Sequence, residues 1–328
     1  MFRNHRAHHP SRAGVAVRLP GLGLLVIGLL VMGLLAIGGC RRDAAPVPAA
    51  QTAPAGPAGA VLRLVHDLRH DDLAGYARHA VPPALHARLD VAWREGRSRW
   101  PLTELPLHER LPGMLATLAA PGAEKALRAT HARQFAGADA ELRSAAATIS
   151  LFAVQYLQRE GDYSDEERDH YIQLVGALGQ WGQRAPLADS RRARAAIGQL
   201  VSGARLTGLA GQTGVSRYAQ VGMDRSLRRL GPFFARFKRV LRSYGLDLNA
   251  ALDSARADLA EQTGDTARVR LRYTVAGRGV DAYVRMQRID GQWYLTDAVR
   301  HAQTQANAPA APAVAIDPVA STPGRRAR

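Results

Sequence analysis

The feature that most constrains this chain is a change in the spacing of its apolar residues. From residue 60 to about 262, apolar residues recur every three or four positions, which predicts amphipathic helices. After Gly264 they alternate with polar residues, which predicts strands. The sequence therefore predicts a mainly α fold, with a helical body and a C-terminal α+β unit of amphipathic helices and a three-stranded antiparallel meander.

The strongest helical pattern covers residues 222–244. Its apolar positions form one face: Leu227, Leu230, Phe233, Phe234, Phe237, Val240, Leu241 and Tyr244. Its opposite face is basic: Arg225, Arg228, Arg229, Arg236, Lys238, Arg239 and Arg242. In a membrane-tethered protein such a helix could lie on the lipid surface, but a core helix with a solvated basic face is the simpler interpretation.

Further helices are predicted over residues 60–80 (a pair), 83–93, 164–181, 188–206 and 247–262. Ser164 and Glu167 have the spacing of a capping box, which begins the third of these helices. Residues 145–157 are apolar on nearly all sides and too short to span a bilayer, so they predict a buried central helix. The Gly-rich residues 203–214 match no phosphate-binding motif and predict a loop between subdomains.

The meander is predicted from strands at about 266–275, 280–289 and 292–297. Asp290-Gly291 is a hairpin signal that pairs Ile289 with Gln292, Arg288 with Trp293 and Met286 with Leu295. A loop at 276–279 pairs Val275 with Val280, Tyr273 with Ala282 and Leu271 with Val284. Both registers place the apolar side chains on one face: Val269, Leu271, Tyr273, Val275, Val280, Ala282, Val284, Met286, Trp293 and Leu295.

The other face of the meander is the candidate binding site. It carries Arg268, Arg270, Arg272 and Arg285, together with Tyr283 and Tyr294. The predicted register places Arg270 opposite Arg285, and like charges in such a pair destabilise a sheet. We expect either solvent screening or an acidic partner there, such as anionic lipid, lipopolysaccharide phosphate or an acidic protein.

The net charge of +16 suggests nucleic-acid binding at first sight. Nine of the 44 basic residues, however, lie in the first 42 and the last four positions, which contain no acidic residue. The rest of the chain has 35 basic against 28 acidic residues, a mild excess spread over many elements. No nucleic-acid-binding motif is present, so no nucleic-acid partner is predicted.

The N-terminus has the form of a secretory signal. Residues 1–18 are basic and residues 19–39 carry no charge. Ile37-Gly38-Gly39-Cys40 resembles the lipobox of bacterial lipoprotein precursors: an aliphatic residue, two small residues and the chain's single cysteine. The resemblance implies that residues 1–39 are removed and that Cys40 is acylated. The alternative is an uncleaved transmembrane anchor with an incidental cysteine.

The lipoprotein resemblance also carries an expectation of location. Arg41 stands where an Asp favours inner-membrane retention in enterobacterial lipoproteins, so the outer membrane, facing the periplasm, is expected. The predicted organisation is a signal peptide (1–39), an Ala/Pro-rich tether (40–59), a helical domain (60–207), a helix-plus-meander unit (215–302) and a disordered tail (303–328).

The sequence contains no strong catalytic motif. His66 and His70 have the spacing of paired metal ligands but no evident third ligand, so no metal or cofactor is predicted. The helix-then-meander order ending in Gly291–Leu295 resembles cystatin-like or NTF2-like accessory domains, which host many functions. The leading expectation is a non-enzymatic binding or assembly factor with the membrane and an envelope protein or anionic lipid as partners; the alternative is an envelope hydrolase.

Overall fold

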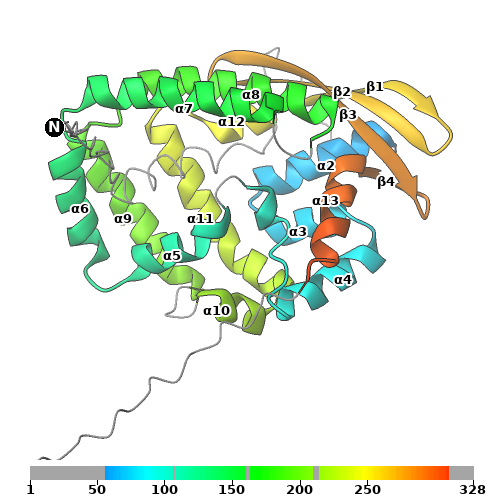
Figure 1. Ribbon diagram of the computed structural model, residues 1–328, viewed down its shortest axis with the longest axis horizontal. Coiled ribbons are helices and arrows are strands. Elements are labelled where there is room, and N and C mark those ends of the chain that lie inside the picture. Colours follow the sequence, from blue (N-terminus) through cyan, green and yellow to red (C-terminus); the bar gives the residue numbers. More distant parts are fainter. Residues whose placement is uncertain (1–55, 106–107, 160–162, 210–213, 310–328) are drawn as a thin grey trace, which may run out of the picture.

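The computed structural model describes residues 56–105, 108–159, 163–209 and 214–309. Within these residues the fold is mainly helical, with an antiparallel sheet near the C-terminus, as predicted (Figure 1). The predicted signal peptide, Cys40 and most of the tether lie outside the described residues.

The N-terminal part of the body consists of short helices. The predicted pair is α2 (Pro57–Arg69) and α3 (Leu73–His79). α2 begins inside the predicted tether, because Pro57 suits a first helical position. Next come α4 (Pro83–Arg94), η1 (Leu102–Glu104), η2 (His108–Arg110), α5 (Leu111–Ala119) and α6 (Ala123–Gln134).

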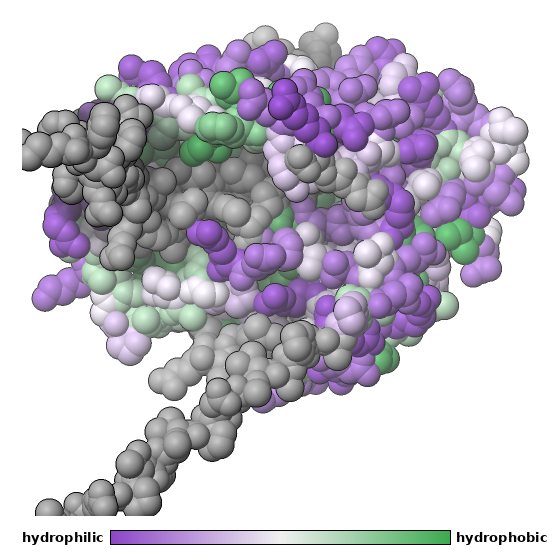
Figure 2. Space-filling model, viewed as in Figure 1, coloured by the Kyte–Doolittle hydropathy of each residue, from purple (hydrophilic) through white to green (hydrophobic). Residues whose placement is uncertain are grey.

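The prediction that residues 145–157 form a buried central helix is wrong: these residues are helical, but the helix is not central. α7 (Asp139–Arg159) packs along α8 (Asp165–Arg184) at the outside of the molecule. Its Leu151, Phe152 and Tyr156 side chains are 59%, 64% and 55% exposed. In Figure 2, hydrophilic residues cover most of the face in view, and hydrophobic residues gather at the upper left near α7 and α8.

Small residues of α8 explain how α7 is held in place mainly by its contact with α8. A Cβ added to Gly179 would lie 2.2 Å from the hydroxyl of Ser150, and one added to Gly182 would lie 3.3 Å from the Cβ of Ala146. The two backbones therefore approach closely along one face of α7. The capping box predicted at the start of α8 is confirmed.

The centre of the body is α11 (Met223–Ser243), which corresponds to the clearest helical pattern of apolar residues in the sequence. It packs against α9 (Ser190–Thr207), and α10 (Gly214–Val221) and α12 (Leu248–Asp253) flank it in the chain. Most of its predicted apolar face is buried, while Phe234 and Tyr244 are half-buried. Lys238, predicted on the solvated face, is buried instead, because its ammonium binds Asp71 at 2.8 Å and the carbonyl oxygens of Leu68 and Arg69.

The sheet has four strands in the order β1-β2-β3-β4, namely β1 (Arg256–Thr263), β2 (Thr266–Val275), β3 (Arg278–Ile289) and β4 (Gln292–Leu295). The last three are the predicted meander. Residues 256–262 were expected to continue a helix, but they pair with the edge of β2 as β1. The edge of β2 has backbone amide and carbonyl groups that need partners. Pairing with them stabilises this segment as a strand, although its residues favour a helix locally.

One predicted register is confirmed and one is wrong. β3 and β4 pair Ile289 with Gln292, as expected from Asp290-Gly291. β2 and β3 pair Val275 with Arg278, a shift of two residues from the prediction. The reason is a two-residue turn in which Ala276 itself adopts a positive φ of 54°. A shift of two preserves which residues share a face, so most of the predicted apolar side chains are buried, with Val284, Trp293 and Leu295 half-buried. Tyr294, predicted on the arginine face, is buried instead.

The C-terminal end of the fold is longer than predicted. α13 (Thr296–Ala306) includes residues 303–306 of the expected disordered tail. Its last carbonyl groups are satisfied by Arg97, which donates to the carbonyl oxygens of Ala306 at 3.1 Å and Ala308 at 2.9 Å. Residues 310–328 of the tail lie outside the described residues.

A shared core joins these elements. α2, α12 and α13 pack on the sheet, and α8 lies beside β3, where Gln173 bonds both the amide and the carbonyl of Asp281. The predicted boundary between the two larger units falls between α9 and α10. Buried residues on both sides of it belong to the same hydrophobic cluster.

Candidate functional site

The predicted arginine face of the meander is already neutralised by the chain. Arg270 makes two hydrogen bonds to Asp281, at 2.9 and 2.5 Å, and Arg272 donates to Asp258 at 2.6 Å. The Asp281 partner holds the pKa of Arg270 above its usual range, and Arg270 holds the pKa of Asp281 below its own. Both pairs are half exposed, so each contributes little to stability.

The predicted opposition of Arg270 and Arg285 is wrong. In the observed register Arg270 lies opposite Tyr283, and Arg285 lies opposite Arg268. Glu166 of α8 relieves this like-charge pair, with oxygens 3.3 Å from Arg285 and 3.8 Å from Arg268. Binding of an external anion at these four arginines therefore stays a prediction that their geometry does not favour.

The histidine pair suggested by the sequence is held locally, since Nδ1 of His70 lies 2.8 Å from the carbonyl oxygen of His66. The rings of His66 and His70 lie 4.0 Å apart at the surface. Across the described ranges, no group of three or more His, Cys, Asp or Glu side chains is placed to hold a metal ion. Cys40, the predicted lipidation site, lies outside the described residues.

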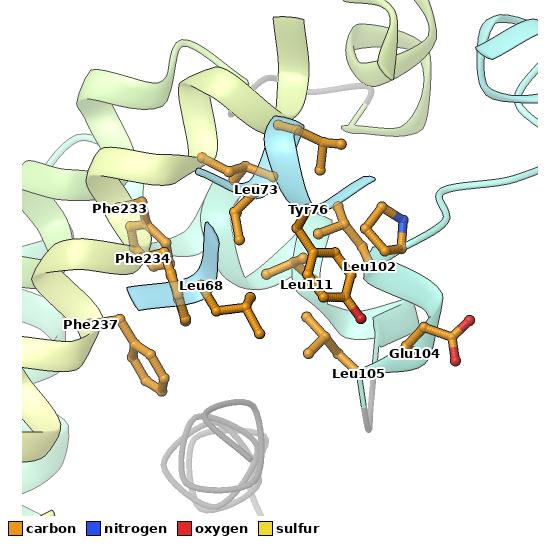
Figure 3. Close-up of a pocket in the computed structure, with 13 residues that line it drawn as sticks. Leu68, Leu73, Tyr76, Leu102, Glu104, Leu105, Leu111, Phe233, Phe234 and Phe237 are labelled. Carbon is orange, nitrogen blue, oxygen red and sulfur yellow. The ribbon is translucent and has the colours of Figure 1, made fainter. Parts of the chain in front are cut away.

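The structure instead shows an apolar pocket that the sequence did not predict. Its volume is about 100 Å³, and it lies where α11 faces α2, α3, α5 and η1 (Figure 3). The lining is Leu68, Leu73, Tyr76, Pro101, Leu102, Glu104, Leu105, Leu111, Leu227, Leu230, Phe233, Phe234 and Phe237. Apart from the Tyr76 hydroxyl and the Glu104 carboxylate, these side chains present only carbon.

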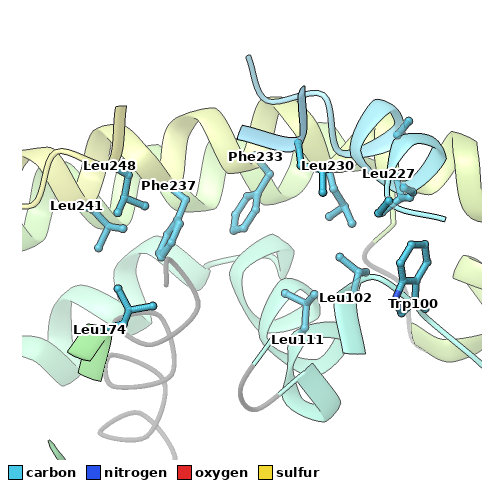
Figure 4. Close-up of a cluster of buried hydrophobic side chains, with 14 of the residues drawn as sticks. Trp100, Leu102, Leu111, Leu174, Leu227, Leu230, Phe233, Phe237, Leu241 and Leu248 are labelled. Atoms are coloured by element: carbon cyan, nitrogen blue, oxygen red, sulfur yellow. The ribbon is translucent and has the colours of Figure 1, made fainter. Parts of the chain in front are cut away.

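The pocket owes its shape to the regular face of α11. Leu230, Phe233 and Phe237 belong to a row of side chains that point from α11 toward Leu102 and Leu111 (Figure 4). This row is rigid because it continues into the buried core. Leu68 and Phe234, which also line the pocket, are only half-buried.

A charged network holds the polar end of the pocket. Glu104 points away from the apolar side chains in Figure 3, and its carboxylate lies 2.9 Å from Nδ1 of His301 on α13. Nε2 of His301 lies 3.8 Å from Glu167 of α8. Arg300 donates to the same Glu167 at 2.8 Å. The network therefore ties η1, α8 and α13 together.

The pKa shifts of His301 and Glu167 indicate which groups of this network are charged. The hydrogen bond to Glu104, with the nearby charge of Glu167, raises the pKa of His301 to about 9. Burial raises the pKa of Glu167 above its usual range. His301 is thus a cation between two carboxylates at neutral pH. A histidine held protonated is poorly suited to act as a general base.

The Tyr76 phenol is the other polar group of the pocket, and burial raises its pKa above the usual range, so it stays neutral at physiological pH. Sequence reasoning placed several lining residues in the core but missed the pocket, since its walls come from five elements that no spacing rule connects. The excess of large apolar residues on α11, including the half-buried Phe234, was the available signal.

Comparison of the chain with protein-family models, with curated proteins and with solved structures finds no match. Within residues 56–309, leaving out the short gaps, no helix has the length and apolar character needed to cross a membrane.

Proposed function

We propose that this protein is a lipid-anchored lipoprotein of the cell envelope that acts as a non-enzymatic binding or assembly factor. The anchor would be Cys40, on the strength of the lipobox that precedes it. Arg41 supports a place in the outer membrane, facing the periplasm. Several acyl chains at roughly 0.8 kcal/mol per buried methylene would make such anchoring durable.

We propose an acyl chain of an envelope lipid as the ligand of the apolar pocket. The observation that carries this proposal is the lining itself, which is almost entirely leucine and phenylalanine side chains. A peptide in such a pocket would leave backbone amide and carbonyl groups without partners, at a cost of roughly 1–3 kcal/mol each. An acyl chain has no such groups, and an envelope anchor would keep the pocket close to lipid.

The size of the pocket sets how much of a chain it takes. Its volume of about 100 Å³ is smaller than the roughly 150 Å³ engineered cavity that binds benzene. The pocket therefore suits the terminal part of a chain rather than a whole lipid. Each methylene that leaves water for the pocket contributes about 0.8 kcal/mol to binding.

The envelope hydrolase is the competing proposal. It draws on Glu104 and His301, a carboxylate and an imidazole at the pocket's polar end. Against it stand the protonated state of His301 and its role in joining η1 to α13. No Ser, Thr or Cys is among the described lining residues, and Glu104, the one carboxylate there, is already bound to His301.

The anchor is tested by metabolic labelling with radioactive palmitate in cells. We expect label on the wild-type protein, no label on Cys40→Ser, and accumulation of the unprocessed precursor with globomycin. Equal labelling of wild-type and Cys40→Ser protein would remove the lipoprotein proposal.

The pocket is tested by titrating hexadecanoic acid into the chain expressed from residue 41, which retains every described element. Leu68→Trp places a larger side chain in the pocket, and Leu62→Trp changes a half-buried leucine of the same helix outside it. We expect at least tenfold weaker binding for Leu68→Trp and unchanged binding for Leu62→Trp. Equal affinities of the two variants would contradict the acyl-chain proposal, whatever the result at Cys40.

A further inference from the structure

The opposite side of α11 forms a second concavity, of a different chemical kind. It lies between α9 and α11, which run side by side (Figure 1), and has a volume of about 390 Å³. Its lining is Gln199, Arg236, Arg239, Arg242 and Ser243, which we call the arginine groove. The volume is within the range of about 300–1,000 Å³ that small-molecule sites occupy.

The three arginines of the groove have no carboxylate partner within the described part of the chain. Arg239 and Arg242 make no side-chain hydrogen bond or ion pair there, and Arg236 donates only to the Pro232 carbonyl oxygen at 3.3 Å. Arg228, on the same face of α11, binds Asp224 at 3.1 Å. Arg225 and Arg229 of this helix face also have no such partner among the described residues, so the groove belongs to a basic face that is largely unpaired, in contrast to the neutralised arginines of the meander.

The spacing of the groove concentrates this charge. Arg236, Arg239 and Arg242 follow one another at intervals of three residues, about 4.5 Å of helix rise each. Like charges on successive turns repel and destabilise the helix by a few tenths of a kcal/mol per pair. A bound anion would remove this repulsion.

Close packing of the helices fixes one wall of the groove. A Cβ added to Gly203 of α9 would lie 2.9 Å from Cδ of Arg236, so the absent side chain lets the arginine lie against α9. At the rim, Arg192 donates to the carbonyl oxygen of Ser243 and also binds Asp189 at 3.2 Å. The Asp189 carboxylate is therefore engaged by Arg192, which is not part of the groove.

We propose that the arginine groove binds the phosphate monoester headgroup of an envelope lipid. Guanidinium groups bind phosphate oxygens in bidentate fashion, and three of them more than balance the charge of a dianion. The amide of Gln199 supplies a further hydrogen bond, whereas the Ser243 hydroxyl already donates to the carbonyl oxygen of Val240 at 2.7 Å. The inference goes beyond the acyl-chain proposal, because the groove and the apolar pocket share no residue and lie on opposite faces of α11.

The test is native mass spectrometry of the full-length protein released from neutral-detergent micelles that contain phosphatidic acid or phosphatidylcholine. The variant is Arg239→Gln with Arg242→Gln. The matched control is Arg191→Gln with Arg194→Gln, two exposed arginines of α9 outside the groove. Glutamine is a good helix former and the groove variant loses like-charge repulsion, so we expect an unchanged or higher unfolding temperature.

We expect the wild type to bind phosphatidic acid in preference to phosphatidylcholine. The groove variant should bind phosphatidic acid at least tenfold more weakly than the wild type does, and the control variant should bind it as the wild type does. Equal binding by the groove variant and the wild type would overturn the proposal, as would an equal loss in the control. A second arm adds inorganic phosphate, which should displace the lipid. Groove-dependent binding of inorganic phosphate without preference for phosphatidic acid would assign the groove to free phosphate and overturn the lipid headgroup.

Discussion

Replacement of His301 by Gln tests the charged network that fixes Glu104 at the pocket. The pKa of His301 is about 9 in the folded protein, because Glu104 accepts a hydrogen bond from it, against roughly 6.5 for an unperturbed histidine. Its side chain is 19% exposed, so solvent screens the interaction only in part. The interval between the two pKa values corresponds to about 2–3 kcal/mol of stability after allowance for this screening.

The pH dependence of this contribution has a defined sign. Because the folded-state pKa is raised, the stabilisation is complete below about pH 6.5, decreases as the pH rises and is lost above about pH 9. Urea unfolding of wild type and His301→Gln, followed by circular dichroism, should show a free-energy difference of about 2–3 kcal/mol at pH 6 that shrinks through this window. A difference that stays constant from pH 6 to pH 10 would show that Glu104 does not raise the pKa of His301.

His170 provides a control of opposite sign. Its Nε2 lies 2.6 Å from the Tyr273 hydroxyl, and burial lowers its pKa to about 4. The neutral ring is favoured in the fold, so the wild type should lose stability relative to His170→Gln as the pH falls below about 6.5. The two variants should therefore diverge from the wild type in opposite pH directions.

Three further substitutions test the packing around the pocket. Lys238→Met leaves Asp71 and two carbonyl groups of α2 without their buried partner, so the free energy of unfolding in urea should fall by about 2–4 kcal/mol. The control Lys125→Met, at an exposed lysine, should lower it by less than about 0.5 kcal/mol. Gly231→Ala would place a Cβ 2.6 Å from the Asp71 carbonyl oxygen, and a loss of about 1–3 kcal/mol is expected; an unchanged melting temperature would contradict this contact. Ser164→Ala removes both the cap of α8 and a hydrogen bond to α13, so we expect a loss of about 1–2 kcal/mol by thermal unfolding, and no loss would contradict the capping role.

The sequence predicts the fold where local residues determine the backbone. Asp290 and Gly291 both take positive φ, as a two-residue hairpin requires, and the β3–β4 register follows from them. The turn before β3 uses Ala276 in the same conformation, which an alanine seldom adopts. Its sequence therefore gives no signal of a two-residue turn, and the predicted register is displaced by two.

Other errors arise from tertiary contacts that composition does not report. Residues 256–263 favour a helix locally, and only the free edge of β2 makes them a strand. The helix at 145–157 is apolar enough for a core position. Gly179 and Gly182 of α8 allow one close contact to hold it, which leaves Phe152 exposed.

The candidate sites depend on such long-range contacts still more strongly. Glu166 neutralises two meander arginines from more than a hundred residues away in the chain. The basic face of α11 is evident in the sequence, and so is the four-residue spacing that pairs Arg228 with Asp224 of the same helix. That no carboxylate of another described element reaches Arg239 is known only from the structure. The pocket needs five elements, and only its α11 wall is a regular pattern.

Our proposed occupant of the pocket beside α11, an acyl chain of an envelope lipid, can be sought directly in cells. The cells are fed a fatty acid with a photoreactive tail and irradiated, and the crosslinked peptides are mapped by mass spectrometry. We expect crosslinks within Leu73–His79 and Met223–Ser243 that disappear in Leu68→Trp and persist in Leu62→Trp. Crosslinks confined to the exposed apolar residues Leu151–Tyr156 of α7, with none at the pocket, would contradict this proposal.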